Sequence, residues 1–312
     1  MFTYTKKGLT ATISSQKGDY KIALDPKRLE RDKINATSHG HTDHLPSKTY
    51  SGMVLASDIT RKIIEKRIGK RILAKENFDN DIFKINLKNA GHCPGSKMVL
   101  LENRESGIKT LYTSDYNTVK KYFGDAKPVE CDNLIVDSTY GDTKFVFPKY
   151  ETVKKEFLDY LKDNKKNNVA IVTYSFGKPQ EICHILEKNK IPFSTDDKIS
   201  EMNKTLGIKY RYESKDANIV VGRKRVESYK NIGLSGHAMN KSFKYYMKLD
   251  KSFILSDHAD YPSGLKFIER CNPETVYTIF GRNIKHAQHI NSELGIKTVS
   301  LNRNQKNLGN YF

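Results

Sequence analysis

The chain has 312 residues, of which 37% are hydrophobic and 29% are charged, so it can bury one large core or two moderate ones. Lysine and arginine (54) outnumber aspartate and glutamate (36), and the net charge of +18 suits either a polyanionic partner such as nucleic acid or a lysine-rich surface that serves solubility. No apolar run of about 18 residues is present, and the first residues lack the charged-then-apolar order of a secretory signal, so we expect an intracellular protein without a membrane partner.

The four cysteines are spread along the chain, and no two of them have C-x-x-C spacing. This distribution argues against a disulfide framework or a zinc ribbon and is typical of a reducing compartment. We expect buried thiols at all four positions, which are Cys93, Cys131, Cys183 and Cys271.

The first half of the chain is predicted to form short strands, several of which end on an acid or a histidine. These strands are KIALD, NATSH, MVLAS, DIFKINL, MVLLEN, KTLYTSD and NLIVDST. From about Lys149 the pattern changes to helix (YETVKKEFLDYLKDNKK), strand (NVAIVTYS) and helix (KPQEICHILEKNK). This alternation predicts an α/β unit inserted at roughly residues 145–250. The strands SFILSD and VYTIFG that follow are predicted to return to the first domain.

The stretch TSHGHTDHLPS carries the clearest chemical signal in the chain. Imidazole and carboxylate groups are ligands that Zn²⁺ and similar divalent ions prefer. His39 and His41 lie two residues apart on a predicted strand-end loop and can converge on one metal. Asp43 and His44 can face a second metal.

Two later motifs strengthen this reading. NAGHCPGS supplies His92 at a turn, and LYTSDYN supplies Asp115 at a strand end, from which it can bridge two metals. Asp25, which ends KIALD, fits a carboxylate that orients a ligand imidazole; the alternative is a plain turn residue. By contrast, His286 and His289 in NIKHAQHINSEL are expected to be helix-face residues.

Together these motifs resemble the metallo-β-lactamase nucleases with a β-CASP insertion, and among them the Artemis-like DNA branch. The matches run in order through most of the chain as SHGHTDH, AGHCPGS, TSDY, VDSTYGDTKFVFP, TYSFGKPQ and LSDHADY. The resemblance implies an αββα metallo-β-lactamase sandwich with an inserted α/β β-CASP domain, and a two-metal phosphodiesterase mechanism. The implied parts are residues 1–144, the insertion 145–250, the return 251–303 and a tail 304–312.

The resemblance also implies roles for individual residues. The ligands of the first metal would be His39, His41, His92 and Asp115, and those of the second would be Asp43, His44 and Asp115. His258 in LSDHADY would protonate the departing 3′ oxygen while Asp137 in VDSTYG fixes its ring; alternatively, His258 would complete the second metal shell. With Asp43, these two are the predicted catalytic residues.

One position departs from the RNA-processing branch, which has a histidine before glycine in a late strand-end motif. This chain has Phe280 in YTIFGR, and the Artemis-like branch is similar in having an apolar residue there. The departure favours DNA as substrate and predicts a weaker second metal site. We expect one or two divalent ions, Zn²⁺ first, with Mn²⁺ or Mg²⁺ as alternatives at the second site.

The segment TYSFGKPQ resembles the part of this branch that holds the 5′-phosphate of the substrate. Ser175 offers a hydroxyl, Gly177 allows close approach of the backbone, and Lys178 stands where a helix would begin. The alternative is a capped helix start with an exposed lysine. If the pocket exists, the enzyme measures from a 5′-phosphorylated end.

The last residues, QKNLGNYF, resemble the box that binds PCNA-type sliding clamps. The alternative is that its aromatic pair anchors the C-terminus in the core. Clamps of this kind belong to archaea and eukaryotes, which would place the protein in an archaeal cytoplasm or a nucleus. The residues of this predicted clamp-binding box are Gln305, Leu308, Tyr311 and Phe312.

The sequence therefore predicts a metal-dependent 5′ to 3′ DNA exonuclease of repair or replication, recruited by a sliding clamp. An RNA-processing ribonuclease of the same superfamily is the first alternative. A nucleic-acid-binding protein without catalysis is the second, and the complete set of first-metal ligands disfavours it. A small-molecule hydrolase is the least favoured, because such enzymes lack the insertion.

Overall fold

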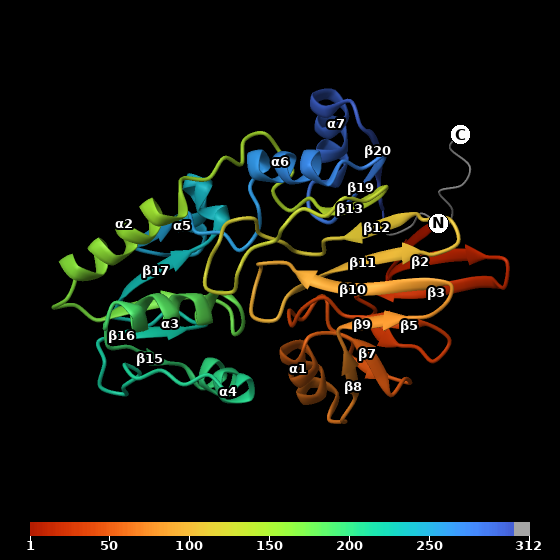
Figure 1. The fold of residues 1–312 in the computed structure, drawn as a ribbon. Coiled ribbons are helices and arrows are strands. Elements are labelled where there is room, and N and C mark those ends of the chain that lie inside the picture. Colours follow the sequence, from red (N-terminus) through yellow and green to blue (C-terminus); the bar gives the residue numbers. More distant parts are fainter. Residues whose placement is uncertain (303–312) are drawn as a thin grey trace. The chain divides into compact units, whose positions relative to one another are not determined.

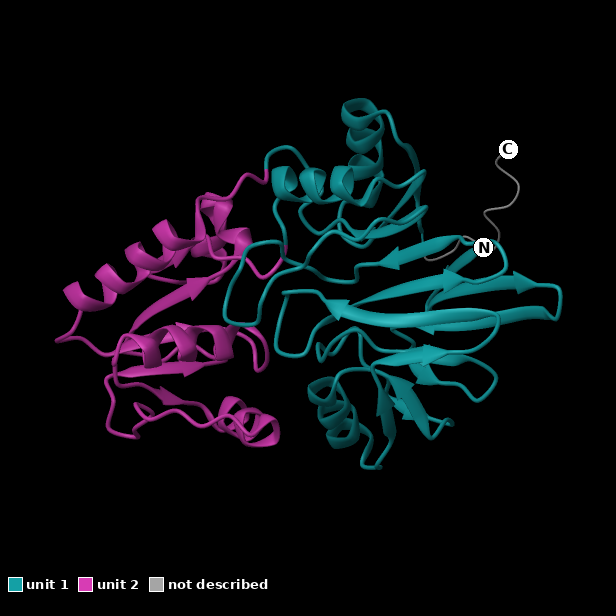
Figure 2. Ribbon diagram, in the orientation of Figure 1, with its two compact units in different colours: residues 1–144, 259–312 teal, residues 145–258 magenta. Residues whose placement is uncertain are grey.

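The computed structural model describes residues 1–302, which form two compact units (Figure 2). The first unit consists of Met1–Lys144 together with the chain from Ala259 onward, and the second consists of Phe145–His258. Each unit has its own sheets and its own buried apolar cluster, as expected of two domains. The predicted fold class, an αββα sandwich with an inserted α/β domain, is confirmed.

Two sheets form the sandwich of the first unit (Figure 1). The first has the order β1 (Phe2–Thr5), β2 (Gly8–Ser15), β3 (Gly18–Leu24), β5 (Ile34–Ala36), β7 (Met53–Leu55) and β8 (Leu73–Lys75). The second has the order β20 (Lys297–Ser300), β19 (Thr275–Ile279), β13 (Asn133–Asp137), β12 (Lys109–Tyr112), β11 (Lys97–Asn103), β10 (Phe83–Asn89) and β9 (Asn77–Asp79). A separate two-stranded ribbon joins β4 (Arg28–Leu29) to β6 (Lys48–Thr49).

The alternation of side chains in β13 explains how the layers pack. Ile135 belongs to the cluster between the two sheets, whereas Leu134 and Val136 belong to a second cluster on the opposite face, because successive strand residues point to opposite faces. That second cluster is completed by apolar residues of α6 (Tyr261–Cys271) and α7 (Asn283–Leu294). The second sheet is therefore buried on both faces.

Helix α1 (Asp58–Ile68) follows β7 and buries Ile63 and Ile64. Its ends carry the expected signals: Ser57 accepts a hydrogen bond from the Thr60 amide, and Gly69 ends the helix at φ +68°. The basic residues of this segment thus occupy the outer face of an amphipathic helix.

The second unit contains a five-stranded sheet in which every pairing is parallel. Its order is β15 (Ser194–Thr195), β16 (Ile219–Gly222), β14 (Val169–Val172), β17 (Lys230–Leu234) and β18 (Lys251–Phe253). The helices of this unit are α2 (Tyr150–Asp163), α3 (Lys178–Lys188), α4 (Asp197–Leu206) and α5 (Lys241–Tyr246), with a 3₁₀ turn η1 (Gly236–Met239). The apolar faces of α2, α3 and α4 and the strands build one buried cluster.

The boundary at which the chain returns to the first unit differs from the prediction. The strand in SFILSD was expected in the first domain, but β18 pairs with β17 and buries Phe253 in the core of the second unit. The return therefore begins at Ala259 rather than at residue 251. A short apolar strand shows by itself which face is buried but not which sheet it joins.

All four cysteines are buried thiols and none forms a disulfide, as predicted. Among residues 1–302, no helix is both long and apolar enough to cross a membrane. The predicted clamp-binding box at Gln305, Leu308, Tyr311 and Phe312 lies outside the described residues.

Candidate metal centre

The predicted metal ligands of the first unit all follow the ends of strands. His39 follows β5, His92 follows β10 and Asp115 follows β12. Strand β3 is parallel to β5, and β12 is parallel to β13. Strand β10 runs in the same direction as β12, because both are antiparallel to β11 between them. Side chains from distant parts of the sequence therefore meet at one edge of each sheet.

The loops after β10 and β12 are held together by their backbones. The amide of Asn117 donates to the carbonyl of Ala90 at 2.8 Å. Gly91, the residue after Ala90, has φ +67°, and a Cβ at this position would lie 2.5 Å from the carbonyl oxygen of Asn117. Only glycine fits this approach, so Gly91 allows the loop that carries His92 to lie against the loop that carries Asp115.

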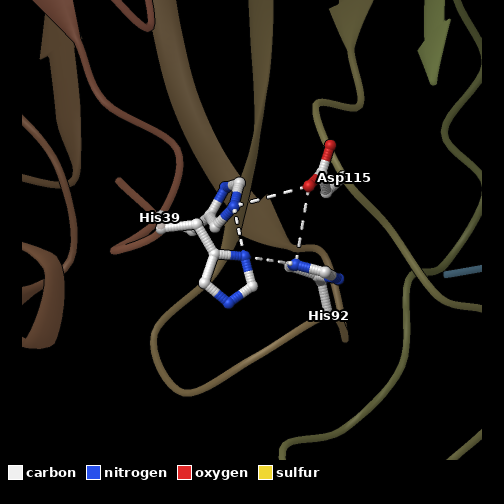
Figure 3. Close-up of side chains that lie close together, drawn as sticks. His39, His92 and Asp115 are labelled. Carbon is white, nitrogen blue, oxygen red and sulfur yellow. Dashed lines mark hydrogen bonds and ion pairs between the residues drawn. The ribbon is translucent and has the colours of Figure 1, made fainter. Parts of the chain in front are cut away.

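Four side chains direct one donor atom each toward a common point (Figure 3). Nδ1 of His41 lies 3.2 Å from Nε2 of His39 and 3.0 Å from Nε2 of His92. Oδ2 of Asp115 lies 3.6 Å from Nε2 of His39 and 3.6 Å from Nε2 of His92. The four donor atoms all lie within 4.8 Å of one another.

This donor set fits a divalent cation. Four ligands placed tetrahedrally at about 2.0–2.2 Å from Zn²⁺ are separated by about 3.3–3.6 Å, and the four separations given above run from 3.0 to 3.6 Å. Three imidazoles and one carboxylate also match the ligand preference of zinc. The geometry thus brings His39, His41, His92 and Asp115 into the arrangement that the sequence predicts, while the identity of the metal stays a prediction.

Asp25 is a buried carboxylate that fixes the surrounding groups. Its Oδ1 accepts the amide of Ser38 at 2.7 Å. Its Oδ2 accepts three hydroxyls, those of Ser38 (2.8 Å), Tyr112 (2.8 Å) and Ser114 (2.9 Å). The same oxygen lies 2.8 Å from Nδ1 of His44, which favours the tautomer with the proton on Nδ1 and leaves Nε2 able to bind a metal. This contact supports the orienting role predicted for Asp25.

His44 forms a second group of donors with two carboxylates. Its Nε2 lies 3.6 Å from Oδ1 of Asp115 and 3.7 Å from Oδ2 of Asp43. Burial disfavours the charged imidazole, but the carboxylates of Asp115, Asp25 and Asp43 outweigh burial and raise the pKa of His44 to about 9. The negative surroundings therefore favour a positive charge at Nε2, which a proton supplies in this structure and a bound cation would supply in its place. The donors match the predicted second metal site.

Three residues around His44 have left-handed backbones although none is glycine. Asp25 has φ +47°, Ser114 has φ +50° and Phe280 has φ +64°, and each follows the end of a strand. The ring of Phe280 meets the ring of His44 edge to face, with centroids 5.2 Å apart. Such backbones are strained and concentrate at functional sites, so this clustering is a further sign of a site.

Asp137 is the last residue of β13, and its carboxylate lies within 4.8 Å of that of Asp115. Oδ1 of Asp137 accepts the amide and the hydroxyl of Thr139 at 2.9 and 2.7 Å. These bonds fix its orientation toward the metal ligands. Two carboxylates this close repel each other unless a cation or a proton donor compensates them.

His258, the predicted partner of Asp137, is the last residue of the second unit and is half-buried. Its amide donates to the hydroxyl of Ser256 at 3.0 Å, and that hydroxyl donates back to the carbonyl of His258 at 3.0 Å. The next residue, Ala259, belongs to the first unit, where its amide donates to the carbonyl of Tyr116 at 2.8 Å. The chain thus re-enters the first unit beside the residue that follows Asp115.

The side chain of Lys178 does not lie where the sequence predicts. It was predicted to present its ammonium to a phosphate at the start of a helix, and it does begin α3. However, its side chain is buried, and Nζ lies 2.5 Å from Oδ1 of Asp257, 2.9 Å from the carbonyl of Leu255 and 3.1 Å from Oε2 of Glu181. Three acceptors within the second unit therefore use the three donors of the ammonium.

The remaining residues of the predicted phosphate site lie just before α3. Gly177 caps the helix at φ +89°, and its amide donates to Oε1 of Gln180 at 2.7 Å. Ser175 is half-buried. Any phosphate contact of this segment consequently rests on Ser175 and the backbone rather than on the lysine, and the site stays a prediction.

Sequence reasoning missed several residues that support the centre. Asp25 accepts hydrogen bonds from Ser38, Tyr112 and Ser114. In the sequence, the only signal for this role is that the three residues stand close to predicted metal ligands. His286 was expected on the surface of a helix, but it is buried and its Nδ1 lies 2.8 Å from the hydroxyl of Ser138. The half-buried His289 fits the helix-face expectation.

No protein-family model matches the chain, but individual proteins do. A protein named "Probable DNA ligase" from Opitutus terrae is 28% identical over 89% of this chain and 30% of its own length. An "Uncharacterized protein in lig 3'region" from Acidianus ambivalens is 37% identical over 41% of this chain and 89% of its own length. The "5' exonuclease Apollo" of Rattus norvegicus is 25% identical over 56% of this chain and 35% of its own length.

Other relatives have names that refer to RNA, among them "RNase aCSPSF2" of Saccharolobus solfataricus. A crystal structure described as a protein of unknown function from Enterococcus faecalis V583 matches with a TM-score of 0.65 at 11% identity, over 98% of this chain and 97% of that one. This match shows the fold alone. The chain spans about a third of the ligase and Apollo relatives.

Proposed function

The chain belongs to the metallo-β-lactamase/β-CASP nuclease family, and we propose that it is a metal-dependent 5′ to 3′ DNA exonuclease that acts on 5′-phosphorylated ends in repair or replication. The observation that carries the proposal is the convergence of His39, His41, His92 and Asp115 on one point. A divalent cation held there would act as a Lewis acid toward a phosphodiester. Asp43 and His44, with Asp115, would hold a second cation.

The chain's own residues have distinct tasks in this proposal. Asp25 keeps the proton of His44 on Nδ1, so that Nε2 stays available. His258 gives a proton to the departing 3′ oxygen, and Asp137, held by Thr139, orients the imidazole. A histidine suits this task because its usual pKa lies close to neutral pH.

Two observations favour DNA over RNA. Phe280 stands where the RNA-processing branch has a metal-binding histidine, and its ring packs on His44. In addition, relatives named for DNA ligation and for 5′ exonuclease activity match 89% and 56% of the chain. The relatives whose names contain RNase support the alternative of a ribonuclease.

A panel of four substrates tests the proposal. Single-stranded DNA and RNA of one sequence, each with a 5′-phosphate or a 5′-hydroxyl and a 3′ label, are incubated with Zn²⁺, Mn²⁺ or Mg²⁺. We expect the 5′-phosphorylated DNA to shorten from its 5′ end. Preferential degradation of RNA would contradict the DNA exonuclease and support the ribonuclease alternative. Binding without cleavage at any metal concentration would contradict both.

Recognition of the 5′-phosphate is assigned to Ser175 and the backbone at Gly177. Ser175→Ala removes one hydrogen bond to a charged group, so the preference for 5′-phosphate over 5′-hydroxyl ends should fall about tenfold. Ser200→Ala, in α4 of the same unit, is the matched control because Ser200 is also half-buried. An unchanged preference in Ser175→Ala would remove the pocket from the mechanism.

We also propose that Gln305, Leu308, Tyr311 and Phe312 bind a PCNA-type sliding clamp. The support is the spacing of these four residues, which suits a polar pocket followed by an apolar groove. Calorimetric titration of an archaeal clamp with the full chain should give binding that Tyr311→Ala with Phe312→Ala abolishes. Equal binding by this double variant would contradict the clamp role.

A further inference from the structure

Helix α5 (Lys241–Tyr246) leaves two adjacent tyrosines in solvent. Tyr245 is 75% exposed and Tyr246 is 85% exposed, which makes them the most exposed aromatic side chains among residues 1–302. The helix contains no buried residue. An aromatic ring offers about 150–250 Å² for burial, so two rings left in water at one place need an explanation outside the fold.

The fold of this segment does not depend on the two tyrosines. Leu249, just after the helix, is buried and packs so closely on Gly233 of β17 that a Cβ there would lie 2.7 Å from a Leu249 methyl. The amide of Leu249 also donates to the carbonyl of Lys244 at 2.9 Å. The helix is thus anchored by the residue behind it, and neither ring belongs to the apolar core of the second unit.

Lysines flank the two tyrosines in sequence, and one of them lies over the ring of Tyr245. Lys241, Lys244 and Tyr245 share one face, since residues three and four apart are neighbours on a helix. Nζ of Lys244 lies 5.8 Å from the ring centre of Tyr245, and Lys248 follows just beyond the helix. The nearest acid in sequence, Asp250, accepts a hydrogen bond from the amide of Asn231 at 2.7 Å. The surface therefore combines exposed aromatic faces with an excess of positive charge.

We propose that α5 and Lys248 form a stacking site for single-stranded DNA, which we name the tyrosine site. Bases stack on Tyr245 and Tyr246, and the lysines bind the phosphates between them. An unpaired strand fits better than a duplex, because duplex bases are already stacked on each other and hidden. The inference rests on the proposed nuclease function and adds a second contact for its substrate. A protein partner would have to remove water from three ammonium groups.

Binding without cleavage tests this inference. A fluorescent 20-nucleotide thymidine strand is titrated with the full chain in the presence of a chelator, and its anisotropy is recorded. Tyr245→Ala with Tyr246→Ala should weaken binding about tenfold or more, whereas the conservative pair Tyr245→Phe with Tyr246→Phe should not. Tyr50→Ala is the matched control, because Tyr50 is 52% exposed but lies in the first unit.

A strand of equal length without bases separates stacking from charge. The wild-type protein and the double alanine variant should bind this abasic strand equally. Lys241→Gln with Lys244→Gln should lower the salt dependence of binding by about two counterions, a slope that the tyrosine variants leave unchanged.

This experiment distinguishes failure of the tyrosine site from failure of the proposed nuclease function. If the wild type binds the strand and the double alanine variant binds it within twofold, the tyrosine site is wrong and the nuclease proposal stands. If the wild type binds no strand at any protein concentration used, the nuclease proposal fails as well. A change of sedimentation from dimer to monomer in the double variant, with equal DNA binding, would assign the surface to a second copy and overturn the inference.

Discussion

Phe280 holds a bulky side chain at φ +64°, a backbone conformation that costs about 1–3 kcal/mol for a residue other than glycine. Its ring is fixed by edge-to-face contacts with His44, at 5.2 Å, and with Tyr4, at 6.3 Å. These contacts offset part of the strain. They also place an apolar ring beside His44, so the proposed second metal site has fewer donors than the first.

Replacing this phenylalanine by a metal ligand should therefore strengthen the second site. Phe280→His adds an imidazole, and histidine tolerates a left-handed backbone better than phenylalanine does. We expect the second equivalent of Zn²⁺ or Mn²⁺ to bind at least about tenfold more tightly in isothermal calorimetry. Phe280→Leu, which keeps the site apolar without adding a β-branched side chain at this backbone, is the control. Equal metal binding by the two variants would disprove the role assigned to position 280.

His286 makes the first unit sensitive to acid. Burial lowers its pKa from the usual 6.5 to about 4, although Asp137 acts in the opposite direction. Between these two values the unfolded chain holds a proton that the folded chain does not, so the free energy of unfolding falls as pH drops from about 6.5 to 4. The full loss is roughly 3 kcal/mol.

Thermal unfolding between pH 7 and pH 4 measures this effect. The melting temperature of His286→Gln should depend less on pH than that of the wild type. Parallel slopes for His286→Gln and the wild type would show that another group causes the acid sensitivity.

Helices α3 and α4 contain the same type of ion pair in two environments. Lys178–Glu181 and Lys198–Glu201 are both spaced i, i+3 with an N–O distance of 3.1 Å. The side chains of the first pair are 5% and 1% exposed, whereas those of the second are 60% and 48% exposed. An exposed pair contributes about 0–1 kcal/mol, but removing one partner of a buried pair leaves an uncompensated charge.

Lys178→Ala should consequently destabilise the second unit by about 3–5 kcal/mol, since Glu181 and Asp257 would lose their shared cation. Lys198→Ala should cost about 1 kcal/mol or less. Hydrogen exchange of amides in β14 and α3 reports the opening of this unit. Similar exchange in both variants would mean that Lys178 does not stabilise the unit. Lys178 would then again be a candidate for binding the 5′-phosphate.

At the scale of the whole molecule, the candidate metal ligands could be predicted from the sequence more easily than long-range contacts between residues. His39, His92 and Asp115 stand at strand ends in short motifs, and strand direction helps to bring them together. The burial of Lys178 was not predictable, because its partner Asp257 lies far along the chain and no local pattern links the two. The same reason explains the misplacement of β18, whose sheet is set by a long-range pairing with β17.

In the proposed mechanism, a divalent cation bound by His39, His41, His92 and Asp115 is required for hydrolysis of DNA. The most direct measurement is the rate at which a 3′-labelled, 5′-phosphorylated single strand is shortened before and after metal removal. We expect chelation to abolish the activity, added Zn²⁺ or Mn²⁺ to restore it, and Asp115→Ala to lower it by about a thousandfold or more. Asp79→Ala, which removes an exposed ion pair with Arg104, should match the wild type. Cleavage that survives chelation, or near-normal activity in Asp115→Ala, would contradict the account.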